Sequence, residues 1–150
     1  IMKNMEKTEK IKNILSVDKE ENTALSLMSA NFIVIHKNTP LSQIFPKIKE
    51  KANNVENIYY SYVVDDNNIP VGVITLKRLL MSENTENLKA SDIMSKRVVK
   101  VKSDYLHSKV AKIFIKYNFG ELPVVDNKNK LIGVITVKDA MNAIIMEWGK

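Results

Sequence analysis

The most informative part of this chain is the stretch Glu121-Leu-Pro-Val-Val-Asp-Asn-Lys-Asn-Lys-Leu-Ile-Gly-Val-Ile-Thr-Val-Lys-Asp139. Two runs rich in Val, Ile and Leu, at Leu122–Asp126 and Leu131–Thr136, flank a polar turn, and this pattern predicts a β-hairpin. A helical pattern follows Thr136, with Asp139 three residues further on. That spacing predicts that the Thr136 hydroxyl accepts a hydrogen bond from a backbone N–H of the first helical turn.

The same pattern occurs once before. At an offset of 61 residues, nine of the sixteen positions from 63 to 78 carry the same residue as positions 124 to 139. The preceding segments match at an offset of 66, with Met28 opposite Met94, so the first copy has about five extra residues around 51–57. We therefore predict an α+β fold of two β-α-β-β-α modules, packed sheet to sheet about a pseudo-twofold axis.

Each module is expected to start with a short helix and a strand, followed by a longer helix. In the first copy Thr39 is predicted to cap the longer helix, Pro40 to take its first position and Pro46 to kink it or end its first part. Ser103 is the expected cap in the second copy. The predicted apolar faces of these helices are Leu41, Ile44, Phe45 and Ile48, and Val110, Ile113, Phe114 and Tyr117.

Three regions are predicted along the chain: an N-terminal helix and linker over residues 1–22, a first module over 23–85 and a second over 86–150. With 45% hydrophobic residues the chain can bury a substantial core, and without cysteine it has no disulfide, thiolate nucleophile or cysteine zinc site. No apolar run approaches the roughly 18 residues that span a bilayer, so this chain is not expected to insert into a membrane. A cytosolic location fits these features.

The net charge of +6 favours anionic partners in general. The lysines are spread among Asn and Glu along predicted helix faces, without an arginine-rich block or an aromatic-interleaved stripe. Nucleic acid is therefore not an expected partner.

Both hairpins carry a hydrophobic-hydrophobic-Asp…Gly-hydrophobic-hydrophobic-Thr pattern, and the second opens with Leu122-Pro123-Val124-Val125-Asp126. With these motifs the chain resembles a tandem cystathionine-β-synthase (CBS) domain pair over residues 23–146. The segment Asn57-Ile-Tyr-Tyr-Ser-Tyr-Val-Val-Asp65 is more specifically similar to the first CBS module of MgtE-type magnesium channels. That resemblance implies that residues 1–20 end a preceding helical domain and that a membrane transport domain follows residue 150.

The resemblance also brings an expectation about metal. The family holds Mg²⁺ with carboxylates of its second module, and only one of the matching positions here keeps a carboxylate. Because Mg²⁺ binds mainly oxygen ligands, usually carboxylates and water, we expect no metal site in this chain and weak or absent Mg²⁺ binding. The matching positions are Leu106, Ser108, Asn118, Asp139 and Asn142.

Thr136 and Asp139 allow two compatible interpretations. They form a helix cap, and in nucleotide-binding CBS pairs the matching residues contact phosphate and the ribose hydroxyls. One carboxylate can accept from two vicinal hydroxyls, and a helix N-terminus favours phosphate. In the first copy Arg78 stands at the place of Asp139, and an arginine has no acceptor for a ribose hydroxyl. Arg78 could meet a phosphate, but solvent exposure is the expectation.

Three further residues are candidates for the nucleotide site. By resemblance, Tyr60 contacts the adenine ring, but it could also be a packed strand residue, since Tyr59, Tyr60 and Tyr62 alternate. Leu122 and Pro123, at the opening of the second hairpin, are the other two.

No catalytic residue is expected. His36 and His107 are isolated in the sequence and are predicted to lie at the surface, and no phosphate loop or nucleophile elbow is present. The predicted function is that of a regulatory module, not an enzyme. It would bind AMP, ADP or ATP between its modules and control an attached MgtE-like transporter. The alternative is a structural CBS module of a stand-alone protein that binds no ligand. A homodimer is expected through the apolar side of the last helix, Met141, Ile144, Ile145 and Trp148.

Overall fold

The computed structural model describes residues 22–83 and 87–148, so the helix expected in residues 1–16 lies outside it. The chain divides into two compact units. The described parts of the first-repeat unit are residues 31–83, 87–99 and 129–131, and those of the second-repeat unit are residues 22–30, 100–128 and 132–148. Each unit therefore includes the short helix that precedes the strand of the other repeat. The module boundaries at 23–85 and 86–150 stay predictions.

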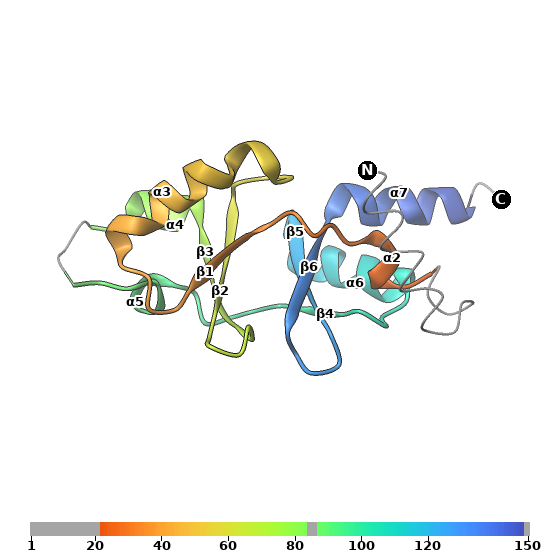
Figure 1. Ribbon diagram of the computed structural model, residues 1–150. Coiled ribbons are helices and arrows are strands. Elements are labelled where there is room, and N and C mark those ends of the chain that lie inside the picture. Colours follow the sequence, from red (N-terminus) through yellow and green to blue (C-terminus); the bar gives the residue numbers. More distant parts are fainter. Residues whose placement is uncertain (1–21, 84–86, 149–150) are drawn as a thin grey trace. The chain divides into compact units, whose positions relative to one another are not determined.

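The first-repeat unit contains a three-stranded mixed sheet in the order β1-β2-β3 (Figure 1). β1 is parallel to β2, and β2 is antiparallel to β3, as expected for a crossover through a helix followed by a hairpin. The extra residues of this copy include a short 3₁₀ helix, Ala52–Asn54, which directly follows α3. The elements are β1 (Ile33–His36), α3 (Leu41–Lys51), β2 (Tyr60–Val64), β3 (Pro70–Thr75), α4 (Leu76–Met81) and α5 (Ala90–Ile93).

The second-repeat unit has the same plan, with a sheet in the order β4-β5-β6 and with β4 parallel to β5. Its elements are α2 (Ala24–Leu27), β4 (Val101–Lys102), α6 (His107–Tyr117), β5 (Glu121–Val125), β6 (Leu131–Thr136) and α7 (Val137–Trp148). The predicted order β-α-β-β-α is thus confirmed in both repeats.

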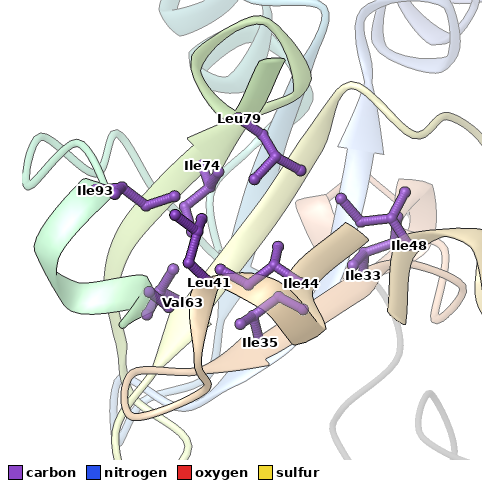
Figure 2. Packing of buried hydrophobic residues seen from close by; sticks show 10 residues of the cluster. Ile33, Ile35, Leu41, Ile44, Ile48, Val63, Ile74, Leu79 and Ile93 are labelled. Atoms are coloured by element: carbon purple, nitrogen blue, oxygen red, sulfur yellow. The ribbon is translucent and has the colours of Figure 1, made fainter. Parts of the chain in front are cut away.

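The core of the first-repeat unit lies between its sheet and α3, α4 and α5 (Figure 2). Three of the four predicted apolar residues of α3 are buried there, but Phe45 is 36% exposed. The buried stripe of α3 is thus narrower than predicted. Figure 2 shows that Ile33, Ile35, Val63 and Ile74 of the sheet face Leu41, Ile44, Ile48, Leu79 and Ile93 of the helices.

The predicted starts of the longer helices are wrong. α3 begins after Pro40 without a side-chain cap, and α6 begins after Leu106 rather than near Ser103. The reason is that the residues before each longer helix bind the backbone of a short helix. The Thr39 carbonyl accepts from Ala90 N of α5 at 2.9 Å, and the Ser103 carbonyl accepts from Leu25 N of α2 at 3.1 Å. Pro46 does not end α3, which continues to Lys51.

The aspartates before the hairpin turns organise them, as the sequence suggests. Asp65 accepts from the backbone N–H groups of Asn67 and Ile69, at 2.9 and 3.0 Å, and Asp126 accepts from Lys128 N at 2.8 Å. The hydrogen bond from Ile69 is the main cause that holds the pKa of Asp65 below its usual value.

Each unit is completed by a strap, which consists of a short helix and the extended residues after it. The N-terminal strap, residues 22–29, exchanges two backbone hydrogen bonds with β6, at 2.8 and 2.9 Å between Ser29 and Val134. The central strap, residues 88–95, exchanges two with β3, also at 2.8 and 2.9 Å, between Ser95 and Val73. A glycine lies beneath a methionine of each strap: Gly133 beneath Met28, and Gly72 beneath Met94.

The two glycines predict that Gly→Ala variants lose stability and that the methionine beside each glycine is the cause. A Cβ at Gly72 would lie 2.2 Å from Met94 Sδ, and its three nearest atoms all belong to that side chain. A Cβ at Gly133 would lie 2.7 Å from Met28 Sδ but also 3.0 Å from the Ser29 backbone oxygen. Each Gly→Ala variant should lower the free energy of unfolding by about 1–3 kcal/mol, because both sites are overpacked. Met94→Ala and Met28→Ala should each relieve the partner Gly→Ala variant in part, because each removes the methionine sulfur but keeps a Cβ, at 2.9 Å from the new Cβ at Gly72 and at 3.1 Å from that at Gly133.

Urea denaturation of the single and double variants gives the two coupling energies. A coupling energy of zero in both double variants would contradict the predicted overlap with the methionine side chains.

Candidate functional site at the start of helix α7

The start of α7 has the predicted cap. The Thr136 hydroxyl accepts from Asp139 N at 3.2 Å, and Val137 N donates to the Gly120 carbonyl at 2.9 Å. Asp139 is half-buried, and its carboxylate forms no hydrogen bond or ion pair with the residues that the structure describes. An acceptor group thus stands beside the N–H groups of a helix of twelve residues, which favour an anion.

Leu122 and Pro123 lie in β5 of the same unit, and both are buried in the folded chain. Their side chains therefore contribute to packing, and contact with a ligand stays a prediction. The strand begins with Glu121, a carboxylate that is only 4% exposed. The sequence analysis did not predict the burial of Glu121. The offset of 61 places it opposite Tyr60, which the resemblance had singled out.

Tyr60 belongs to the first-repeat unit, at the start of β2. It is half-buried and pairs across the sheet with Thr75. The structure therefore places Tyr60 beside the first helix cap, whereas Thr136 and Asp139 belong to the second-repeat unit. That Tyr60 shares a site with Asp139 stays a prediction.

The start of α4 repeats the backbone geometry of α7. Thr75 Oγ1 accepts from Arg78 N at 3.1 Å, and Leu76 N donates to the Tyr59 carbonyl at 2.9 Å. Arg78 is mainly exposed, as expected, but its Nε–H also donates a hydrogen bond to the carbonyl of Ile93 in α5. The guanidinium is therefore tied to a neighbouring element.

The prediction that both histidines lie at the surface is wrong for His107, which is 7% exposed at the start of α6. Its Nε2 lies 3.0 Å from Ser26 Oγ and 3.1 Å from the Thr23 carbonyl. The Ser26 hydroxyl donates to the Thr23 carbonyl at 2.7 Å rather than to the histidine, so Ser26 Oγ is available to accept from Nε2. This contact holds the N-terminal strap and does not activate a nucleophile.

His36 lies at the surface, as predicted. Its Nε2 is 2.6 Å from Asp66 Oδ1, and the side chain is 39% exposed. Its Nδ1 accepts from Asn38 N at 3.1 Å. These contacts fasten the end of β1 to the β2–β3 turn.

Two of the positions that match metal ligands of the resembled family have other roles here. Leu106 precedes α6 with an exposed side chain, and Asn118 ends α6 in a left-handed conformation with φ 53°. In residues 22–83 and 87–148, no three His, Asp or Glu side chains gather in a way that could hold a metal ion. None of the helices described there is long and apolar enough to cross a membrane.

The fold and these helix starts define a pair of CBS domains: the CBS domain family matches residues 24–83 and 90–146, and the chain belongs to this family. Its CBS pair is similar to the cytosolic CBS region of the magnesium transporter MgtE. The MgtE of Thermus thermophilus is 30% identical over 128 residues, which are 85% of this chain and 28% of that protein. This chain therefore spans little more than a quarter of that relative.

Two solved structures show what similar proteins bind. The cytosolic domain of the Mg²⁺ channel MgtE in complex with ATP matches with a TM-score of 0.79 and 30% identity, over 85% of this chain and 50% of that chain. CBSX2 in complex with AMP matches with a TM-score of 0.68 and 25% identity, over 83% of this chain and 97% of that chain.

The altered metal positions predict a weak response to Mg²⁺ alone. Leu106 has no oxygen ligand in its side chain, and Asn118 offers only a neutral one, so titration of nucleotide-free protein should give no saturable change in protease protection below about 1 mM. Strong protection at micromolar Mg²⁺ would contradict this expectation. It would place an ion site at other acids, such as Asp65, Asp66 or Glu121.

Proposed function

We propose that this chain is a regulatory module that binds an adenine nucleotide, AMP, ADP or ATP, and controls an attached protein. The carboxylate of Asp139 beside the capped start of α7 is the observation that carries the proposal. It can accept both ribose hydroxyls, while the helix start accommodates a phosphate. The ATP and AMP complexes of similar proteins support this choice of ligand.

The attached protein in this proposal is an MgtE-like magnesium transporter, with the module on the cytosolic side of the membrane. The similarity to MgtE across most of this chain supports it. The module has no catalytic role of its own. A nucleotide would act by binding one arrangement of the module more tightly than another, because a ligand shifts an equilibrium only through such a difference.

The competing function is a structural module that pairs with a second copy and binds nothing small. The exposed apolar residues of α6 and α7 favour it as well, so the two functions differ only in ligand binding. A thermal-shift series with AMP, ADP and ATP separates them, because a ligand at a hundred times its Kd adds about 2.7 kcal/mol of stability.

Replacing Asp139 should weaken nucleotide binding. We expect Asp139→Ala to cost about 1.5–3 kcal/mol of binding free energy, the range for hydrogen bonds to a charged group. Asp139→Asn keeps the shape of the side chain and one acceptor, and should cost less. Isothermal titration with ATP, ADP and AMP measures the change, and circular dichroism checks that α7 remains folded.

Arg78→Ala is the matched control, because Arg78 holds the equivalent position in the first repeat. It should leave the affinity nearly unchanged. Equal binding by wild type and Asp139→Ala, together with loss of binding in Arg78→Ala, would show that the wrong helix start has been chosen.

The exposed apolar residues of α6 and α7 predict that the protein forms a homodimer. Ile115 of α6 is 75% exposed, and Ile145 and Met146 of α7 are 63% and 69% exposed, which is a large apolar area for a surface. The side chain of Trp148, also expected on this face, lies outside the described residues. We predict a homodimer with twice the monomer mass of 17.1 kDa, measured by light scattering.

The double variant Ile145→Lys, Met146→Lys should shift the protein to the monomer, and Leu80→Lys on α4 serves as the control. A wild-type monomer at high micromolar concentration would contradict the prediction.

A further inference from the structure

The two straps are held by different side chains, although their backbones pair alike. In the central strap, the carbonyl of Ile93 accepts from Arg78 Nε. The next two residues are held as well: Met94 lies over Gly72, and Ser95 pairs with Val73. Three consecutive residues of this strap are thus fastened to β3 and α4.

Among the residues that the structure describes, no arginine holds the position equivalent to Arg78 beside the N-terminal strap. By the offsets of the repeat, Leu27 corresponds to Ile93 and Asp139 to Arg78. A carboxylate has no hydrogen to donate, so Asp139 cannot bond the carbonyl of Leu27 as Arg78 bonds that of Ile93.

A side-chain contact of the N-terminal strap lies at its other end. His107 Nε2 contacts Ser26 Oγ and the Thr23 carbonyl, at 3.0 and 3.1 Å. In the first repeat the position of His107 is taken by Leu41, which is part of the apolar core. The central strap therefore accepts a side-chain hydrogen bond beside the helix start, whereas the side-chain contact of His107 lies at the opposite end of the N-terminal strap.

We propose that Arg78 is a built-in clamp that holds the central strap shut whether or not a ligand is present. The guanidinium occupies the place where the second repeat has Asp139 and binds a carbonyl of the chain itself. Only the N-terminal strap, whose helix α2 contacts α7, is then left to respond to nucleotide. This last part rests on the proposed function, whereas the clamp itself does not.

Hydrogen exchange of four backbone amides tests the clamp. Ser95 and Val73 donate to each other across the central strap, and Ser29 and Val134 do so across the N-terminal strap. In Arg78→Ala, the amides of Ser95 and Val73 should exchange at least tenfold faster, while those of Ser29 and Val134 stay unchanged. Arg78→Lys, which keeps the charge but has no Nε–H at that place, should behave like Arg78→Ala. Lys77→Ala, an exposed neighbour, is the control and should change none of the four.

The result that overturns the clamp is exchange at Ser95 and Val73 no faster in Arg78→Ala than in Lys77→Ala. Global loosening, in which all four amides accelerate together in Arg78→Ala, overturns it as well. The unchanged pair of Ser29 and Val134 shows within the same sample that the variant is folded.

Addition of ATP, ADP or AMP to the wild type separates this inference from the proposed function. Slower exchange at Ser29 and Val134, without change at Ser95 and Val73, supports both. Slower exchange at Ser95 and Val73 overturns the clamp, because nucleotide should not change the exchange of a strap that is already held closed without ligand. If no nucleotide binds while Arg78→Ala still accelerates Ser95 and Val73, the proposed function fails and the clamp stands.

Discussion

The close approach of a strap to a glycine in each sheet is the constraint on which both units depend. Ser29 and Ser95 each exchange two backbone hydrogen bonds with a strand, and the preceding methionine lies against the glycine next to the paired valine. Any side chain at Gly72 or Gly133 would occupy that space, because a Cβ there would lie within 3 Å of the methionine sulfur. The retained glycine of each hairpin thus has a packing reason, and neither glycine has a positive φ.

The two helix starts show how one backbone arrangement can hold opposite chemistry. Both use a threonine cap and the carbonyl of the residue just before the middle strand, with hydrogen bonds that agree to within 0.1 Å. The third position after the cap carries opposite chemistry in the two repeats. A side chain with only donors at position 78 binds a carbonyl of its own chain, whereas a side chain with only acceptors at position 139 is suited to donors from outside it.

Much of the fold could be predicted because both copies of the repeat have the same pattern of hydrophobic residues and the same kinds of turn residue. The hairpins, their aspartates and the Thr136 cap depend on residues close in sequence, and all of them were predicted correctly. The starts of α3 and α6 were not, because Thr39 and Ser103 give their carbonyls to a short helix about 50 or 80 residues away in the chain. A capping residue recognised from its neighbours in the sequence gives no information about hydrogen bonds that its backbone forms with distant parts of the chain.

The candidate site divides in the same way. The Thr136 cap followed from spacing alone, but the burial of His107 did not, because it depends on Ser26 and Thr23 more than 80 residues earlier. A histidine at the first position of a helix offers no sign of this in the sequence. The offset of 66, however, places His107 opposite Leu41, which is a core residue of the first repeat. A comparison of the two copies could therefore have indicated that His107 is buried.

The exchange of short helices between repeats bears on how such a chain could have arisen. The first-repeat unit lacks its strap without residues 88–95, and the second-repeat unit lacks its own without residues 22–29. An ancestral protein of a single repeat would have had to obtain this piece from a second molecule, by reciprocal domain swapping. Duplication and fusion would then have turned an exchange between two molecules into one within a single chain. Two copies in one chain need no longer be identical, and here the equivalent positions 78 and 139 hold arginine and aspartate.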